Sequence, residues 1–142
     1  NRGEQRRAPV GDVSPSNILN SEKSAEIMME KKVAYLNNKE KKAIKSFVKD
    51  LREKLGDDIV SIRLFGSKAR GDFKKNSDID IFILVKEKTL KIRDIIAEIE
   101  VDYDIEYNLP ISTVLYSLFE YKKNKELGSF FFENVEKEGI AL

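Results

Sequence analysis

The 142-residue chain contains no cysteine and no histidine. Without cysteine, the chain can form neither a disulfide nor a thiolate metal site. Without histidine, it has no Ser-His or Cys-His nucleophile, and it cannot bind zinc through imidazole groups. Any metal must therefore be bound by oxygen ligands, which magnesium, manganese and calcium prefer.

Segments that would enter a membrane are also missing from the sequence. No apolar run approaches the roughly 20 residues that a transmembrane helix needs, and no signal-peptide pattern is present. We therefore expect a cytoplasmic protein without membrane contact.

An excess of charge of one sign is absent as well. The chain has 26 Lys and Arg residues against 25 Asp and Glu residues, so its formal net charge is +1. Proteins that coat nucleic acid need a clear basic excess, so nucleic acid is not the favoured partner, although the composition allows a local basic patch. Apolar residues make up 41% of the chain, which is enough for one core in one domain.

Proline is rare, and its distribution separates the start of the chain from the rest. Two of the three prolines, Pro9 and Pro15, lie in a polar stretch without hydrophobic periodicity that covers residues 1–27. This composition favours a flexible or extraneous leader. We therefore predict a leader over residues 1–27 and a single folded domain over residues 28–142.

Hydrophobic periodicity predicts helices and strands in mixed order after the leader. Apolar residues at helical spacing predict helices at about 39–55, 90–100, 117–123 and 129–138. Alternation of apolar and polar residues predicts strands at about 59–65, 78–85 and 103–107, and extended chain at 111–116. This order indicates an α+β (mixed α/β) fold in which helices pack on a mixed sheet.

Two local features add detail to this outline. Asn37 and Glu40 have the spacing of a capping box, which would begin the first helix. In the last helix, the run Phe130-Phe131-Phe132 is expected to pack two of its three rings into the core and to leave one exposed.

Asp78 and Asp80 form the first candidate for a chemical site. Both lie at the start of the hydrophobic strand 78–85, and alternation places their side chains on the same face, with Cα atoms roughly 6.5–7 Å apart. Two carboxylates at this spacing can converge on one or two divalent ions, as in two-metal phosphoryl-transfer sites. Ile79 and Ile81 face the other way and would anchor the strand in the core.

Gly66-Ser67 forms the second candidate, directly after the strand 59–65. Glycine allows a tight turn and a close approach of the backbone to a ligand. A short helical turn at 68–71 would present amide groups to an anion, and Lys68 and Arg70 would add positive charge beside it. The pattern predicts a binding site for a triphosphate that faces a metal held by Asp78 and Asp80.

A third carboxylate is expected to complete the metal shell or to activate the acceptor. On the predicted strand 103–107 and just before it, Asp102, Asp104 and Glu106 would share one face. We prefer Asp104, because it lies within the strongest part of the strand pattern, and Asp102 and Glu106 are its rivals.

Together, these motifs resemble the signature of a known superfamily. Gly66-Ser67, ten intervening residues and Asp78-Ile79-Asp80 match the Gly-Ser-x10-Asp-x-Asp signature of the DNA polymerase beta-like nucleotidyltransferases. Residues 68–72 and the tail 132–140 are similar to the minimal nucleotidyltransferases, prokaryotic members of about this size. The resemblance covers about residues 39–142.

The resemblance implies a fold, an activity and site residues. Members have a mixed sheet with flanking helices and transfer a nucleoside monophosphate from a nucleoside triphosphate, with two magnesium ions and release of pyrophosphate. Carried over, Gly66 and Ser67 would bind the triphosphate, and Asp78, Asp80 and Asp104 would bind metal. The expected donor is ATP.

The resemblance also implies a partner. Many small members pair with an all-helical toxin of the HEPN class (higher eukaryotes and prokaryotes nucleotide-binding) and act as antitoxins, and some add AMP to a toxin tyrosine. The favoured hypothesis is thus a protein adenylyltransferase that acts on a hydroxyl of a HEPN partner. The alternatives are a catalytically idle module that occludes a helical partner, and an aminoglycoside-type enzyme, which the short chain disfavours.

Overall fold

A computed structural model of the protein describes residues 33–74 and 77–142. The predicted leader over residues 1–27 lies outside the described residues, so the predicted boundary of the domain stays a prediction. Within the described ranges, no helix combines the length and the apolar character that crossing a bilayer requires.

The first described helix begins as the sequence predicts. α2 spans Asn38–Leu55, and Asn37 Oδ1 accepts a hydrogen bond from Glu40 N at 2.8 Å while Glu40 Oε1 accepts one from Asn37 N at 2.9 Å. The capping box is therefore confirmed, and it satisfies two amide groups that a helix start leaves without partners. The buried side of α2 contains the apolar residues Ala43, Ile44, Phe47, Leu51 and Leu55.

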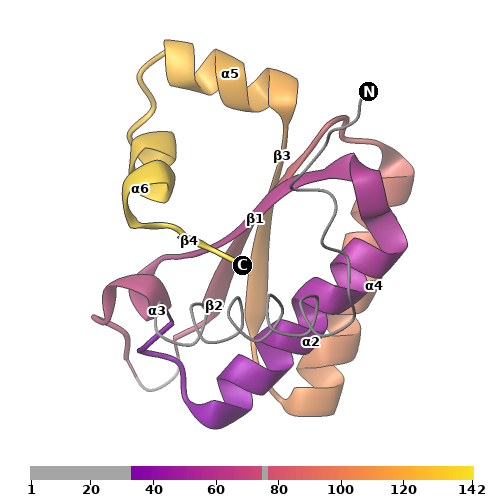
Figure 1. The fold of residues 1–142 in the computed structure, drawn as a ribbon, viewed down its shortest axis with the longest axis vertical. Coiled ribbons are helices and arrows are strands. Elements are labelled where there is room, and N and C mark those ends of the chain that lie inside the picture. Colours follow the sequence, from indigo (N-terminus) through magenta and orange to yellow (C-terminus); the bar gives the residue numbers. More distant parts are fainter. Residues whose placement is uncertain (1–32, 75–76) are drawn as a thin grey trace, which may run out of the picture. The chain divides into compact units, whose positions relative to one another are not determined.

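Four strands form one mixed sheet (Figure 1). They are β1 (Ile59–Phe65), β2 (Ile79–Val85), β3 (Ile111–Ser117) and the short β4 (Ile140–Ala141), in the order β3-β2-β1-β4. β1 is antiparallel to both of its neighbours, and β2 is parallel to β3. The prediction of a mixed α/β fold with helices on a mixed sheet is confirmed.

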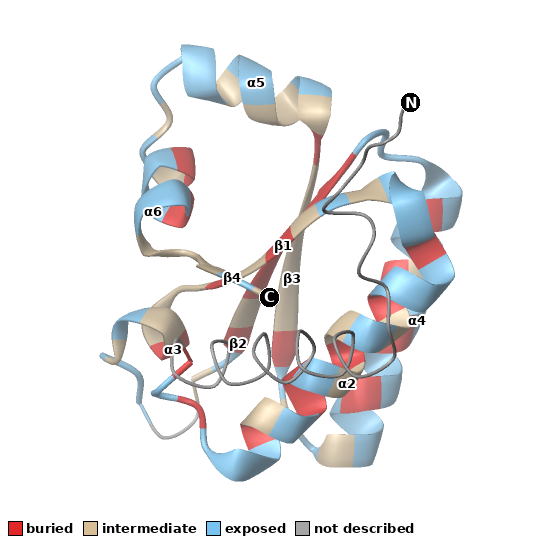
Figure 2. Ribbon diagram, in the orientation of Figure 1, coloured by how far each residue is buried: buried red, intermediate tan, exposed pale blue. Residues whose placement is uncertain are grey.

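The two faces of the sheet carry different helices (Figures 1 and 2). On one face, alternate residues of β1 and β2 pack with α2 and α4 (Leu90–Tyr107) into the larger core, which includes Ile62, Leu64, Ile79, Ile81, Ile83 and Val85. On the other face, α5 (Leu118–Glu126) and α6 (Phe130–Glu138) cover a smaller cluster of Phe82, Leu84, Phe132 and Val135. Alternation along β2 thus sends neighbouring residues into two separate clusters.

The phenylalanine run at the start of α6 packs as expected. Phe132 is 2% exposed, Phe131 is half-buried against the smaller cluster, and Phe130 is 80% exposed. Two rings therefore pack inward and one faces solvent, because three consecutive helical positions cannot all point to one side.

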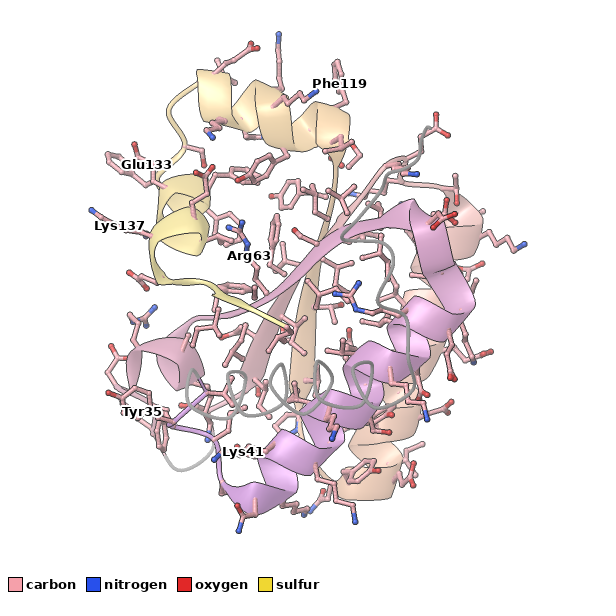
Figure 3. All side chains as sticks on the ribbon, viewed as in Figure 1. Tyr35, Lys41, Arg63, Phe119, Glu133 and Lys137 are labelled. Carbon is pink, nitrogen blue, oxygen red and sulfur yellow. The ribbon has the colours of Figure 1, made fainter. Side chains whose placement is uncertain are left out.

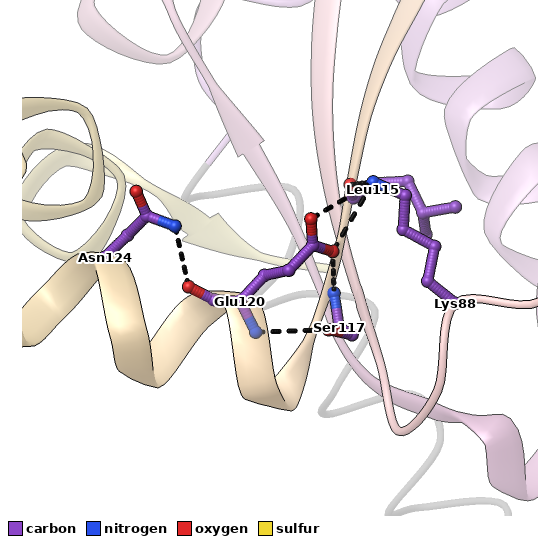
Figure 4. A network of polar contacts seen from close by, with 5 residues as sticks. All are labelled: Lys88, Leu115, Ser117, Glu120 and Asn124. Carbon is purple, nitrogen blue, oxygen red and sulfur yellow. Dashed lines mark hydrogen bonds and ion pairs between the residues drawn. The ribbon is translucent and has the colours of Figure 1, made fainter.

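A polar network fixes the junction between β3 and α5 (Figure 4). Ser117 and Glu120 form a second capping box, in which Glu120 N donates to Ser117 Oγ and Ser117 N donates to Glu120 Oε1, each at 3.1 Å. Lys88 Nζ donates to Leu115 O at 3.3 Å and also contacts Glu120. The hydrogen bond from the Ser117 backbone is the main cause that lowers the pKa of Glu120.

The predicted strand at 103–107 is wrong, since these residues form the last turns of α4. The buried residues of α4 are Ile92, Ile96, Ile99 and Tyr103, a helical spacing that continues past the predicted end at residue 100. The Tyr103 hydroxyl lies 2.6 Å from both Ser46 Oγ and Asp50 Oδ2 of α2. Packing against α2 therefore outweighs the short alternation of apolar and polar residues.

Candidate active site

The candidate site lies where the antiparallel strands β1 and β2 meet at their connected ends. Phe65, the last residue of β1, pairs with Asp80, the second residue of β2. Gly66 follows Phe65 directly, and Asp78 directly precedes β2. Strand pairing thus brings the two halves of the predicted signature together.

Gly66 and Asp80 are in direct contact. Gly66 has φ +75°, and a Cβ at this position would overlap the Asp80 Oδ2 atom. A residue with a side chain would therefore be strained by its backbone and would also displace the carboxylate. The glycine of the signature is required because the turn lies against the second aspartate.

A single helical turn, α3 (Ser67–Arg70), continues from Gly66. The amides of Ala69 and Arg70 both donate to Gly66 O, at 3.0 and 3.1 Å, and Gly71 N donates to Ser67 O at 2.8 Å. Ser67 is half-buried at the start of this turn. The predicted helical turn after Gly66-Ser67 is therefore confirmed, and it places Ser67 one residue from the contact with Asp80.

The two aspartates repel one another in a partly buried position. Burial is the main cause that raises the pKa of Asp80, the charge of Asp78 raises it further, and the charge of Arg70 acts in the opposite direction. Asp78 is exposed and Asp80 is half-buried. A divalent cation would relieve both the repulsion and the loss of hydration, so this donor set fits magnesium.

Lys68 does not present its charge to solvent. Its Nζ atom lies 2.8 Å from Glu40 Oε2 on α2 and 4.1 Å from the centre of the Phe73 ring, and both side chains of the ion pair are 7% exposed. In the structure, the ammonium group is thus engaged by α2. The sequence predicted Lys68 as a positive charge beside the anion site and gave no sign of Glu40 as its partner.

Arg70 remains on the surface beside the aspartates. Its guanidinium contacts Asp72 and Glu138, each at 3.2 Å. These hydrogen bonds raise the pKa of Arg70, and the one to Asp72 contributes most. The charge of Arg70 also acts to lower the pKa of Asp80.

The structure does not bring the predicted third carboxylate to this site. Asp104 lies on α4 and is exposed, as are its rivals Asp102 and Glu106. Across residues 33–74 and 77–142, no three acidic residues are grouped so that they could hold a metal ion. The premise of the Asp104 assignment, a strand at 103–107, is wrong for the reason given above.

The strand that lies beside Asp80 is β3, and it offers a serine. In the parallel pairing of β2 and β3, the partner of Asp80 is Ser112, and register partners share a face. Ser112 is half-buried. The predicted extended segment at 111–116 contained this position, but only the parallel register identifies it as the neighbour of Asp80.

Comparison with known proteins gives consistent matches. A family model described as "Nucleotidyltransferase domain" matches residues 44–141. The "Putative protein adenylyltransferase MJ0141" of Methanocaldococcus jannaschii is 39% identical over 100 residues, which are 70% of this chain and 94% of that protein. The "Putative protein adenylyltransferase MJ0604" of the same organism is 36% identical over 103 residues, which are 72% of this chain and 97% of that protein.

Two solved structures are more distantly similar. A nucleotidyltransferase from Sulfolobus solfataricus, described as putative, has a TM-score of 0.47 at 18% identity and covers 82% of this chain and 84% of its own. The structure described as "the toxin-antitoxin with AMP-PNP" has a TM-score of 0.44 at 20% identity and covers 68% of this chain and 69% of its own.

Proposed function

Since this chain belongs to the nucleotidyltransferase domain family, we propose that it transfers AMP from ATP to a hydroxyl group of a partner protein. The observation that supports a working site most directly is the fit of Gly66 against the Asp80 carboxylate, with Asp78 beside it. The choice of AMP and of a protein acceptor follows two relatives, each named as a putative protein adenylyltransferase.

In this proposal, the acceptor hydroxyl loses its proton to solvent as its oxygen forms a bond to the α-phosphorus of ATP, and the bond from that phosphorus to the α–β bridging oxygen breaks to release pyrophosphate. Asp78 and Asp80 would hold magnesium, since their carboxylates lie close enough for the charge of one to act on the other, and magnesium prefers oxygen ligands. Magnesium, when bound, supplies charge neutralisation for the phosphates.

The remaining residues of the site orient the donor. The backbone of Gly66 and the Ser67 hydroxyl lie next to Asp80, where they can hold the triphosphate beside the metal ligands. Arg70 adds positive charge at the edge of the site. Asp104 is exposed on α4 and is not grouped with Asp78 and Asp80 among the described residues, so the proposal gives it no part in the reaction.

The proposed partner is a small all-helical protein of the HEPN class, as the resemblance of the sequence implies. A second function, neutralisation of that partner by occlusion without chemistry, is favoured by one observation. The position beside Asp80 on β3 is Ser112 and not an acid, so the described residues offer two carboxylates to the proposed metal site where three were expected.

Calorimetric titration separates these functions in its first step. ATP, CTP, GTP and UTP are titrated with and without magnesium into the wild-type protein and into Asp80→Asn. Magnesium-dependent binding of ATP that is lost in Asp80→Asn supports the transferase. Absence of binding to the wild-type protein would contradict it and favour occlusion.

A second step tests the transfer itself. The protein is incubated with α-labelled ATP and a small helical protein encoded by a neighbouring gene, where one is present, and label on that protein is measured after denaturing gel electrophoresis. Rescue of growth from that partner by an Asp78→Asn/Asp80→Asn double variant would indicate occlusion, because the variant retains its surface but not its metal ligands.

A further inference from the structure

The described residues contain two buried charged side chains, and they contact each other. Among residues 33–74 and 77–142, the buried polar and charged residues are Glu40, Lys68 and Ser117. Glu40 and Lys68 form an ion pair of 2.8 Å. The proposed transfer reaction uses neither residue, so the presence of this pair calls for a separate explanation.

Stability does not explain a buried ion pair well. Removing two charges from water costs about as much as their attraction returns, and apolar residues of similar volume often give an equal or more stable fold. An ion pair with further hydrogen bonds does fix a geometry, because each oxygen and each N–H group has a defined partner. In the Glu40–Lys68 pair, both carboxylate oxygens have a partner, and the ammonium group lies between Glu40 Oε2 and the Phe73 ring.

Each end of the pair is tied to a different element. Glu40 Oε1 accepts the amide of Asn37 at 2.9 Å in the capping box of α2, and the other oxygen, Oε2, contacts Lys68. Lys68 directly follows Ser67 in the single turn of α3. One carboxylate therefore connects the start of α2 to the turn that would bind phosphate.

The other end of α3 is held by the segment that precedes α2. Gly71 has φ +97°, and a Cβ on it would lie 2.6 Å from the Tyr35 ring, so the ring packs directly on this glycine. Figure 3 shows Tyr35 beside α3. A helix of one turn has no stability of its own, so these two contacts hold it in place.

We infer that Glu40 is a positioning residue of the nucleotide site, which acts through Lys68 to hold the Gly66–Ser67 turn against Asp80. This inference rests on the proposed function of that site. Glu40 and Lys68 need not touch the nucleotide. Their contribution is to keep the turn in the one arrangement in which Gly66 lies against the Asp80 carboxylate.

The variants Glu40→Gln, Lys68→Met and Glu40→Gln/Lys68→Met test the inference. Gln retains an oxygen for the capping box and loses the charge, and Met retains the length of lysine. The double variant leaves no unpaired charge, so it should recover the melting temperature lost in the single variants. Lys88→Met is the matched control, because it removes an ion pair with Glu120, away from α3.

Hydrogen exchange gives a readout that needs no nucleotide. The amides of Ala69, Arg70 and Gly71 close the turn of α3, and we expect them to exchange at least about tenfold faster in all three variants. The exchange rates of the α4 amides should be unchanged in these three variants. The exchange rates of the α3 amides should be unchanged in the Lys88→Met control. Unchanged exchange in α3 would overturn the inference, whether or not the protein binds ATP.

Nucleotide binding gives the second readout. In the double variant, the magnesium-dependent affinity for ATP should fall by about 10-fold to 100-fold. The KM for ATP should rise by a similar factor, with a smaller change in kcat. A double variant that recovers its melting temperature and binds ATP as the wild type does would show a purely structural role. If the wild-type protein fails to bind ATP, the proposed function fails, while exchange at α3 still decides the role of Glu40.

Discussion

At the scale of single residues, the contact of Gly66 with Asp80 links backbone conformation to chemistry. Gly66→Ala should lower the free energy of unfolding by about 1–3 kcal/mol, because it adds strain at φ +75° and displaces the Asp80 carboxylate. Urea denaturation measures the change. Gly128→Ala is the matched control, since Gly128 has φ +71° and a Cβ there would meet no atom within 4 Å.

A double-mutant cycle isolates the contribution of the carboxylate. In an Asp80→Ala background, Gly66→Ala should lower the free energy of unfolding by about 0.5 kcal/mol or more less than it does in the wild-type protein, because the overlapping Asp80 oxygen is gone. Equal costs in both backgrounds, or equal costs for Gly66→Ala and Gly128→Ala, would show that Asp80 does not constrain the turn.

The pKa of Asp80 predicts a conflict between stability and function. Because this pKa is raised in the folded state, the native protein binds more protons than the unfolded chain between the ordinary carboxyl pKa and the raised value. The contribution of Asp80 to the free energy of unfolding therefore falls as pH rises through that window. Above it, the ionised carboxylate destabilises the fold.

Asp80→Asn should thus be more stable than the wild-type protein at pH 7 and should lose nucleotide transfer by at least about 100-fold. In thermal melts from about pH 4 to pH 8, the melting temperature of the variant should exceed that of the wild-type protein by an amount that increases with pH through the window. A variant less stable than the wild type at pH 7, without magnesium, would contradict the assignment of strain to this carboxylate.

At the scale of elements, the starts of α5 and α6 offer a matched pair of serines. Ser117 accepts a hydrogen bond from Glu120 N, whereas the Ser129 side chain makes no capping hydrogen bond. Ser117→Ala should lower the free energy of unfolding by about 1 kcal/mol, and Ser129→Ala should have a much smaller effect. Similar losses in chemical denaturation would contradict a specific cap at Ser117.

The elements also show which parts of the site were predictable. Gly66-Ser67 and Asp78-x-Asp80 lie at the connected ends of one pair of strands, so their spacing along the chain determines their meeting in space. The partner of Lys68 could not be predicted in this way, because Glu40 lies on α2 and only the packing of α2 against the turn brings it there.

The third carboxylate illustrates the limit of local patterns. Residues 103–107 alternate like a strand, but Tyr103 extends the buried side of α4 and contacts α2 through Ser46 and Asp50. A five-residue pattern cannot include this contact between distant helices. The helix at 39–55 was predictable from its long apolar face and its capping box, and the helix at 129–138 was predictable from the helical spacing of its apolar residues.

The register of β2 and β3 leads to a gain-of-function prediction. Ser112 is the partner of Asp80, so Ser112→Asp would place a third carboxylate on the same face. In the absence of metal it should destabilise the fold by like-charge repulsion, and it should bind magnesium at least about tenfold more tightly, as measured by calorimetry. Thr113→Asp, one residue along β3 and thus on the other face, is the control for magnesium binding only, because Thr113 donates a hydrogen bond to Glu100 and an aspartate there would also cause like-charge repulsion.

At the scale of the described domain, separate pairs of helices cover the two faces of the sheet. α2 and α4 cover one face, while α5 and α6 cover the other face around Phe82 and Leu84. Asp80 lies next to this covered part and is half-buried, and Arg70 reaches Glu138 at the end of α6. The candidate site therefore lies at the border of the smaller cluster.

The antiparallel pairing of β1 with β2 has a consequence for the order of folding. This pair closes over a short connection, whereas the parallel pairing of β2 with β3 must wait for the whole of α4 to cross over. Short loops cost less entropy to close, so β1 and β2 should pair in the transition state and β3 should dock later.

Leu64→Ala should then mainly slow refolding, and Ile111→Ala should mainly speed unfolding, in stopped-flow measurements. The reverse would mean that the sheet grows from β3. In the expected order, the Gly66–Ser67 turn forms in the folding nucleus, and the protein acquires its candidate active site before its sheet is complete.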